Sequence, residues 1–225
     1  MNPTEYILEL PSNKRPDDVS IPEKWYPGIK QYWDRSTTKR IYNPIDGIRA
    51  AVIHATAGSS SEGAVSVMMD GKASWHWLVP DENEEQHEKL VWACAPEALA
   101  AWHVRNSQKH PDVWNGSNKI NHWSVGLEVV NAQKNYDDYS DWQIEVTAQI
   151  VRYCWAKYPN FKYVVSHAAM DPKRRTDPGV KFPWKHFEEL VLSSKNDDTG
   201  LDALSTTPAR KIETTPLNEN HCCCG

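Results

Sequence analysis

Three side chains in the middle of the chain have the types and the setting of a hydrolytic metal site. His54 ends the apolar run IRAAVIH, His167 ends the run KYVVSH, and Asp177 lies ten residues after His167 in RRTDPG. Two imidazoles and one carboxylate, with a fourth position left to water, form a known catalytic arrangement around Zn²⁺. Zinc lowers the pKa of a bound water to about 7 and polarises a carbonyl oxygen, which are the two requirements of amide hydrolysis.

Each of these residues also has a simpler interpretation. A histidine at the end of a strand is often a hydrogen-bonded structural residue, and an aspartate before Pro-Gly often only forms a turn. The metal-site interpretation therefore depends on the combination of His54, His167 and Asp177. The irregular segment after His167 would return the aspartate to a metal that the histidine already faces.

A fourth candidate, Glu128, lies inside the apolar segment HWSVGLEVVN. Side chains alternate between the two faces of a strand, so Glu128 would share a face with Ser124 and Gly126. The other face would carry Trp123, Val125, Leu127 and Val129. Because a buried carboxylate is costly without a partner, and its neighbours on that face are small, we interpret Glu128 as facing open space in a cleft. The alternative is a strand glutamate that faces solvent or pairs with a lysine.

The elements that must position these residues predict a layered α/β domain. Ile48–His54 is an almost continuous apolar run, which suits a strand covered on both faces. The segments ASWHWLVP, HWSVGLEVVN and KYVVSH predict further strands. Because these strands alternate with helical segments, we expect a mixed central β-sheet flanked by helices.

Three helices are predicted between and after these strands. Ser59 and Glu62 have capping-box spacing, so one helix should begin there and stop at Gly71. FPWKHFEELVLSS predicts a closing helix. The strongest helix lies in DYSDWQIEVTAQIVRYCWAKYP, where apolar residues recur at helical spacing. These apolar residues are Ile144, Ala148, Val151, Trp155 and Tyr158.

The 225 residues divide into three zones, which we expect to form one domain with two extensions. Residues 1–45 are rich in proline and charge and predict an irregular arm that wraps the body. Residues 46–192 carry the regular apolar segments. Residues 193–225 contain few large apolar residues and predict a disordered tail.

Composition and sequence pattern argue against two classes of function, nucleic-acid binding and membrane spanning. The net charge is -5 and no basic block stands out, so a nucleic-acid partner is not expected. No run approaches the roughly 20 apolar residues of a membrane span. The first residues lack the pattern of a standard signal peptide, so we expect a cytoplasmic protein or export to the cell wall by another route.

The five cysteines do not form a disulfide framework. Cys94 and Cys154 read as isolated buried thiols. Cys222, Cys223 and Cys224 are adjacent, and adjacent cysteines rarely pair with one another. Metal capture, lipidation and an end without a role all remain open for this tail.

Three ordered motifs together resemble one enzyme family. VIHATAG, VGLEVVN and SHAAMDPKRRTDPG, with ASWHWLV and AAWHVRNS between the first two, look like the zinc-dependent N-acetylmuramoyl-L-alanine amidases of type 2. That family includes the bacterial recycling amidase, phage lysins and the animal peptidoglycan-recognition proteins. The resemblance covers about Ile48 to Leu190. It implies a mixed sheet flanked by helices, with the site in a groove along one face.

The resemblance also implies the site residues and the reaction. One Zn²⁺ ion would be held by His54, His167 and Asp177, with Glu128 as general acid and base. The bond cleaved by the family is the amide between the lactyl group of N-acetylmuramic acid and L-alanine of the stem peptide, so peptidoglycan or a muropeptide is the expected partner. Glu128 would take a proton from the attacking water and deliver it to the leaving nitrogen.

Two further residues match positions of interest in the family. Recycling amidases and short phage lysins carry lysine two residues before the metal aspartate, where this chain has Arg175. Arginine stays protonated, so Arg175 could hold an oxyanion but not shuttle a proton; a surface arginine is the alternative. His103 is either a contact to substrate or oxyanion, or a structural residue. His76 is expected to be structural.

Two rival functions remain beside the enzyme. Some members of the family bind peptidoglycan without cutting it because a metal ligand has been lost, whereas this chain has a suitable residue at every ligand position. A purely structural zinc site usually closes with four protein ligands, often cysteines, and neither Cys94 nor Cys154 lies beside the ligand motifs. An immunity or delivery partner is a further open possibility.

Overall fold

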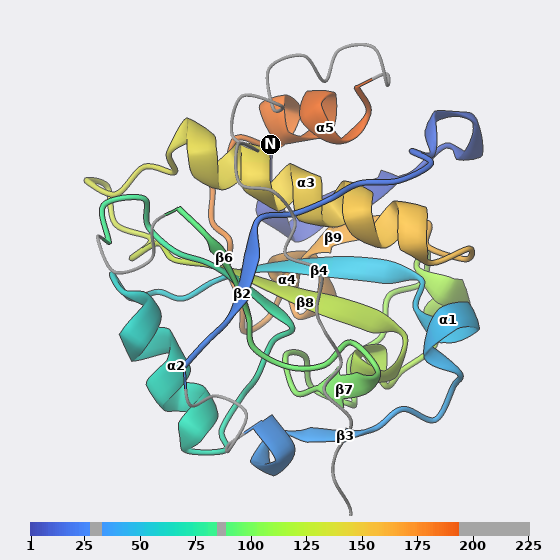
Figure 1. Cartoon of the computed structure of the whole chain (residues 1–225). Coiled ribbons are helices and arrows are strands. Elements are labelled where there is room, and N and C mark those ends of the chain that lie inside the picture. Colours follow the sequence, from blue (N-terminus) through green and yellow to red (C-terminus); the bar gives the residue numbers. More distant parts are fainter. Residues whose placement is uncertain (28–32, 85–88, 194–225) are drawn as a thin grey trace, which may run out of the picture.

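A mixed β-sheet runs through the middle of the molecule and carries the candidate site (Figure 1). The structure is a computed structural model and describes residues 1–27, 33–84 and 89–193. Within these residues the central sheet has seven strands. Their order across the sheet is β1 (Ile7–Glu9), β9 (Tyr163–Ser166), β4 (Ala50–Ala55), β8 (Ser124–Val129), β5 (Trp77–Val79), β6 (Val91–Ala93) and β2 (Glu23–Trp25). The prediction of a mixed sheet is therefore confirmed.

The centre of the sheet is parallel. β4 pairs in parallel with β9 on one side and with β8 on the other, and β8 pairs in parallel with β5. β1 and β6 run antiparallel to their neighbours β9 and β5, and β2 pairs in parallel with β6. Because β9, β4 and β8 all point the same way, their carboxyl ends meet at one edge, where sites form in α/β sheets.

Helices cover both faces of the sheet. α3 (Asp141–Lys157) lies across one face and α5 (Trp184–Val191) packs on its outer side (Figure 1). α2 (Ser61–Met69) covers the opposite face near β5 and β6. The short helix α1 (Pro44–Gly47) precedes β4, and the short helix α4 (His167–Met170) follows β9. A second, two-stranded sheet joins β3 (Thr37–Lys39) to β7 (Leu99–Ala101).

Short 3₁₀ helices complete the connections. They are η1 (Pro3–Glu5), η2 (Ser12–Lys14), η4 (Trp33–Arg35), η6 (Trp114–Gly116) and η7 (Ile120–His122). η7 leads directly into β8, so it sets where that strand begins. None of the helices that the structure describes combines the length and the apolar character of a membrane-crossing segment.

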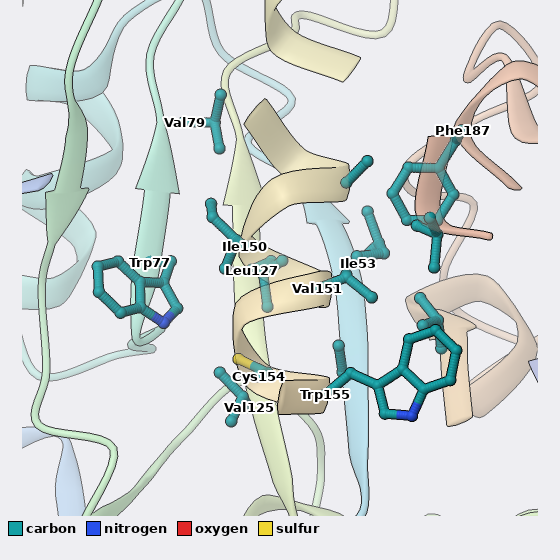
Figure 2. Close-up of a cluster of buried hydrophobic side chains, with 14 of the residues drawn as sticks. Ile53, Trp77, Val79, Val125, Leu127, Ile150, Val151, Cys154, Trp155 and Phe187 are labelled. Atoms are coloured by element: carbon teal, nitrogen blue, oxygen red, sulfur yellow. The ribbon is translucent and has the colours of Figure 1, made fainter. Parts of the chain in front are cut away.

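The main apolar core lies between the sheet and α3 (Figure 2). Ile53 of β4 and Leu127 of β8 are fully buried there against Ile150 and Val151 of α3. The helix is predicted correctly by its apolar spacing, and Ser140 and Gln143 form a capping box at its start. Burying a side chain of this size contributes about 1.5–3 kcal/mol to stability, so this face supplies much of the energy that holds β4 and β8 in place.

Two local predictions are wrong by a small shift. α2 is capped by Ser60, whose side chain accepts from the backbone N–H of Gly63, so Ser59 and Glu62 do not form a capping box. Trp123 precedes β8 and packs on the face opposite α3, because its backbone is not extended and the alternation starts only at Ser124. Gly71 does follow the end of α2, at a positive φ of 69°.

The proline-rich arm, predicted to be irregular, contributes strands to the central sheet. Within residues 1–45 it supplies β1 and β2, which are the two edge strands on opposite sides of the central sheet. Ile7 of β1 pairs with Val165 of β9, the strand that precedes His167.

The domain boundaries at residues 45 and 192 stay a prediction. The tail predicted to be disordered, with its three cysteines, lies outside the described residues from residue 194 onward, while Cys94 and Cys154 are free and buried as expected.

Candidate active site

A cleft of about 460 Å³ opens at the carboxyl ends of β4, β8 and β9. Its walls come from the strand ends, from one side of α2 and from the segment between α4 and α5. The residues that line it include His54, Val67, Trp75, His103, Glu128, Gln133, His167, Arg174, Arg175, Thr176 and Asp177. Every site residue predicted from the sequence therefore lines this one cleft.

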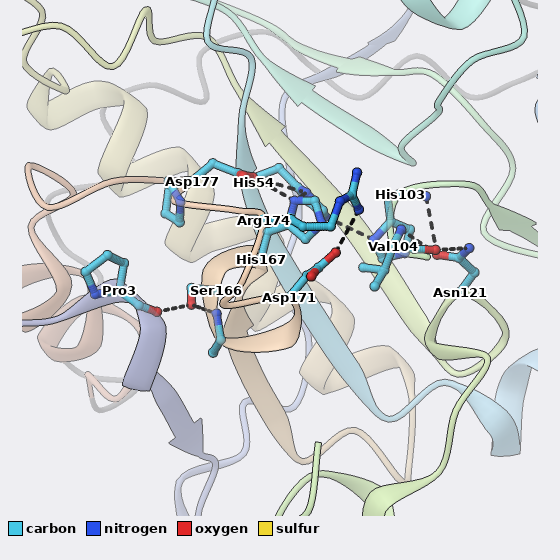
Figure 3. Close-up of polar contacts among 12 residues, drawn as sticks. Pro3, His54, His103, Val104, Asn121, Ser166, His167, Asp171, Arg174 and Asp177 are labelled. Atoms are coloured by element: carbon cyan, nitrogen blue, oxygen red, sulfur yellow. Dashed lines mark hydrogen bonds and ion pairs between the residues drawn. The ribbon is translucent and has the colours of Figure 1, made fainter. Parts of the chain in front are cut away.

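His54, His167 and Asp177 converge on a common centre (Figure 3). The Nδ1 atoms of the two imidazoles are 2.9 Å apart, and Asp177 Oδ2 lies 2.9 Å from Nδ1 of His167 and 3.5 Å from Nδ1 of His54. Bonds of about 2.0–2.2 Å in a tetrahedral zinc site hold neighbouring donor atoms roughly 3.3–3.5 Å apart. One of the three spacings lies in this range and two are shorter, so the three donors lie close enough together to hold one divalent ion.

The irregular segment that follows α4 is anchored so that Asp177 returns to His167. The backbone N–H of Ala168 donates to the carbonyl of Asp177 at 2.9 Å, and the hydroxyl of Tyr139 donates to the carbonyl of Pro178 at 2.6 Å. Gly179, at a φ of 87°, closes the turn by donating to the carbonyl of Thr176. A positive φ is readily adopted by glycine, which explains the glycine at this position.

The N-terminal arm braces the helix that presents His167. The hydroxyl of Ser166 accepts from the backbone N–H of Ala169 and donates to the carbonyl of Pro3 (Figure 3). Ser166 is thereby the N-cap of α4, whose first residue is His167. The ring of Tyr6 stacks on Trp184 with centroids 3.7 Å apart. The arm thus fixes the position of a candidate metal ligand that lies more than 150 residues later in the chain.

The electrostatics of the cluster favour the donor forms of its side chains. Burial, and then the neighbouring His167, lower the pKa of His54 to about 4, although Asp177 acts in the opposite direction. Burial alone would raise the pKa of Asp177, but the neighbouring imidazoles of His167 and His54 lower it below its usual range. At neutral pH the carboxyl of Asp177 is therefore ionised and the imidazole of His54 is neutral, as metal binding requires.

Glu128 faces the cleft beside His54. The two residues are partners in the parallel register of β4 and β8, and Glu128 is only 8% exposed. Burial raises the pKa of Glu128 well above its usual value, Asp177 raises it further, and Arg175 acts against both. A raised pKa favours the protonated form of the carboxyl, so Glu128 can hold a proton in this cleft.

The small residues on this face of β8 predicted open space beside Glu128, and this prediction is wrong. The imidazole of His103 fills that space, and a Cβ added at Gly126 would lie 2.7 Å from Cγ of His103. Nδ1 of His103 lies 3.0 Å from Nε2 of His54, and Nε2 of His103 lies 3.2 Å from Oγ of Ser124. Both ring nitrogens of His103 are therefore engaged within the protein.

His76 and Arg40 form a buried layer behind His103. His76 accepts from the backbone N–H of Gly126 at 2.9 Å and lies 3.0 Å from the carbonyl of Leu99, which agrees with its expected structural role. Arg40 of the arm donates to the carbonyls of Asn121 and Ser124, and burial lowers the pKa of Arg40 to about 10. Sequence reasoning missed Arg40, because nothing in its local context separates it from the other charges of the arm.

The two arginines beside Asp177 differ in their contacts. Arg174 donates to the carboxylate of Asp171 at 2.9 Å, and Asp171 is itself buried (Figure 3). Arg175 lines the cleft and is close enough to influence the pKa values of His54 and Glu128. Arg175, the arginine singled out from the sequence, is therefore the one whose charge affects His54 and Glu128.

Comparison with known proteins assigns more than half of the chain to one family. Residues 43–180 match the family model described as N-acetylmuramoyl-L-alanine amidase. The chain belongs to this family. It is 27% identical over 177 residues to the N-acetylmuramoyl-L-alanine amidase AmiD of Escherichia coli, covering 75% of this chain and 62% of AmiD. It is 33% identical over 92 residues to the 1,6-anhydro-N-acetylmuramyl-L-alanine amidase AmpD of the same organism, covering 40% of this chain and 46% of AmpD.

Solved structures show the same fold within this amidase family. AmpDh3 of Pseudomonas aeruginosa, in complex with anhydromuramic pentapeptide, has a TM-score of 0.57 at 26% identity, covering 68% of this chain and 62% of AmpDh3. AmiD of E. coli, in complex with anhydro-N-acetylmuramic acid-L-Ala-D-γ-Glu-L-Lys, has a TM-score of 0.54 at 28% identity, covering 64% of this chain and 57% of AmiD. The chain thus spans less than two thirds of the length of these relatives.

Proposed function

We propose that this chain is a zinc-dependent peptidoglycan amidase, which hydrolyses the amide between the lactyl group of N-acetylmuramic acid and L-alanine of the stem peptide. The observation that carries the proposal is the convergence of His54, His167 and Asp177 in the cleft that Glu128 also faces. Membership of the amidase family supports the same reaction.

In this proposal His54, His167 and Asp177 hold one Zn²⁺ ion. The ion supplies Lewis-acid polarisation of the scissile carbonyl and activation of water at neutral pH. The three side chains come from β4, from the start of α4 and from the turn after it, so each is fixed by backbone hydrogen bonds. A site held in this way costs little reorganisation when substrate binds.

Glu128 is the proposed general base and general acid. It would remove a proton from the attacking water and return that proton to the departing nitrogen of L-alanine. Arg175 lines the same cleft, and its guanidinium would stabilise negative charge on the substrate carbonyl oxygen. A well-placed donor of this kind contributes about 3–4 kcal/mol in other enzymes.

The proposed substrate is a fragment of peptidoglycan. The complexes of AmpDh3 and AmiD contain anhydromuramic peptides, which supports a muropeptide as the ligand of this cleft too. Two settings fit such a reaction: recycling of fragments in the cytoplasm, and attack on the intact wall after export. Comparing the rates on soluble anhydromuropeptides and on intact sacculi would distinguish them.

The test is to incubate the zinc-loaded protein with muropeptides and measure free stem peptide by mass spectrometry. We expect release of the peptide by the wild type, loss after chelation, and a decrease of roughly 10²–10⁴-fold in Glu128→Gln. Glu128→Gln should still bind zinc, because Glu128 is not one of the three converging donors. A wild type that binds both zinc and muropeptide but releases no peptide would instead be the non-catalytic binding module.

A further inference from the structure

The imidazole of His54 is held from behind by a line of buried hydrogen bonds. Nε2 of His54 lies 3.0 Å from Nδ1 of His103, and Nε2 of His103 lies 3.2 Å from Oγ of Ser124. The hydroxyl of Ser124 in turn donates to the carbonyl of Ile120 at 2.7 Å. The three side chains of this line are each less than 9% exposed.

The end of the line sets the direction of every hydrogen bond in it. A backbone carbonyl only accepts, and a serine hydroxyl has one hydrogen. Since Ser124 gives that hydrogen to Ile120, it must accept from Nε2–H of His103. Nδ1 of His103 then carries a lone pair, which accepts from Nε2–H of His54.

The consequence falls on the other nitrogen of His54. A neutral imidazole carries one proton, so a proton on Nε2 leaves Nδ1 of His54 with a free lone pair. That Nδ1 is the atom that points at His167 and Asp177, 2.9 Å and 3.5 Å from their facing atoms. The line thus selects the tautomer that can bind a metal at this atom.

The backbone holds His103 in this position. The side-chain oxygen of Asn121 accepts from the backbone N–H groups of His103 and Val104 at 3.3 Å and 2.8 Å, and its amide donates back to Val104 at 2.7 Å (Figure 3). On the other side, Gly126 lets the ring approach the strand more closely than any side chain would permit. His103 is therefore fixed against both β8 and the loop that carries it.

We propose that His103 and Ser124 are positioning residues that orient His54 and select its metal-binding tautomer, and that His103 does not contact substrate. The proposal relies on the proposed function only for the identity of the ion. Of the two alternatives predicted for His103, it favours the structural one, because both nitrogens of that ring already have partners. Partners of metal-binding histidines typically contribute 10–100-fold to metal affinity.

The experiment compares His103→Leu with His103→Asn by measuring the Zn²⁺ dissociation constant in competition with a chromophoric chelator. Leucine can accept no hydrogen bond from His54, so zinc affinity should fall 10–100-fold. The side-chain oxygen of asparagine can occupy the place of Nδ1, so affinity should recover in part. His186→Leu, on the exposed face of α5 and outside the cleft lining, is the matched control and should bind zinc as the wild type does.

A second readout reports the tautomer directly. Long-range ¹H–¹⁵N NMR spectra of the metal-free wild type should show His54 protonated on Nε2, and His103→Leu should shift that population toward Nδ1–H. Ser124→Ala removes one acceptor without a change of shape and should lower zinc affinity by a smaller factor, which keeps the proposal testable if His103→Leu does not fold.

Two results would overturn the proposal. The first is a folded His103→Leu with wild-type zinc affinity and an unchanged His54 tautomer. The second is a variant whose zinc affinity is intact while KM for muropeptide rises, since this would make His103 a substrate contact. Zinc affinity is measured without substrate, so a wild type that cleaves no muropeptide would refute the proposed function and leave this proposal standing.

Discussion

The two faces of β8 are made by the same six residues, Ser124–Val129, yet they serve opposite purposes. Val125, Leu127 and Val129 belong to the main apolar core. Figure 2 shows Val125 and Leu127 on the side of the sheet that faces α3. Ser124 and Gly126 face the imidazole of His103, and Glu128 faces the cleft. All six residues are buried, so the difference between the faces is one of chemistry and not of exposure.

The comparison shows how one strand can carry both stability and function. On the apolar face, the contribution to folding stability depends on the buried area and the packing density, and no single atom determines it. On the polar face each group has a specific partner, and a buried polar network is favourable only when every member is satisfied. Substitutions on the first face should therefore change stability, and those on the second face should change metal binding and the response to pH.

Leu127→Ala is expected to have the largest effect on folding. Leu127 is fully buried in the main core, and replacing such a leucine by alanine lowers the free energy of unfolding by about 2–5 kcal/mol. Urea denaturation of the metal-free protein measures this loss. Zinc affinity of the folded variant should stay within about twofold of the wild type. A large loss of zinc affinity with little loss of stability would show that the two faces are not separable.

The elements on the apolar face could be predicted because their patterns are long. β4 and β8 are buried apolar runs, and α3 repeats its apolar residues over 17 residues. The edge strands β1 and β2 have three residues each, and the partner of Ile7 is Val165, so no local pattern marks them. The shift of one residue at the start of α2 arose because Ser59, Ser60 and Ser61 are equally good caps by type.

The polar face could be predicted only in part. The histidines, Asp177 and Glu128 were found from their positions at strand ends and from ordered motifs, and the structure brings them together. The packing of the His103 ring against Gly126 was not predicted, because His103 lies in a different segment of the sequence. Small residues beside a buried carboxylate indicate that something large approaches, but they do not say which side chain it is.

Gly126→Ala tests the polar face with the smallest possible change. The added Cβ would lie 2.7 Å from Cγ and 2.9 Å from Cδ2 of His103, so the ring must move. Overpacking of this kind costs about 1–3 kcal/mol of unfolding free energy. Because the displaced ring is the partner of His54, zinc affinity should fall by roughly tenfold, as chelator competition would measure.

The matched control for this variant is Ala51→Gly on β4, which alters a small residue on the apolar face. It should weaken folding without a change in zinc affinity. If Gly126→Ala bound zinc as the wild type does, His103 could move without consequence for His54, and the separation of the two faces would lose its structural basis.

The smallest expected effect, taken per pH unit, is the pH dependence that His76 adds to stability. Burial, and then the neighbouring Arg40, lower the pKa of His76 from 6.5 to about 3, so the folded state resists its protonation. Its contribution to the free energy of unfolding is complete above pH 6.5 and is lost progressively as the pH falls toward 3. One such group changes stability by at most about 1.4 kcal/mol per pH unit.

His76→Asn isolates this contribution, because the side-chain oxygen of asparagine can still accept from the backbone N–H of Gly126 while the residue no longer titrates. The difference in unfolding free energy between wild type and His76→Asn, measured by urea denaturation of metal-free protein, should shrink as the pH is lowered from 7 to 4. The other titrating groups are common to both proteins and cancel in the difference. A difference that stayed constant over this range would mean that His76 is protonated as easily in the folded state as in the unfolded chain. The imidazole of His76 could then carry a charge in the folded state, although its hydrogen bonds require a neutral ring.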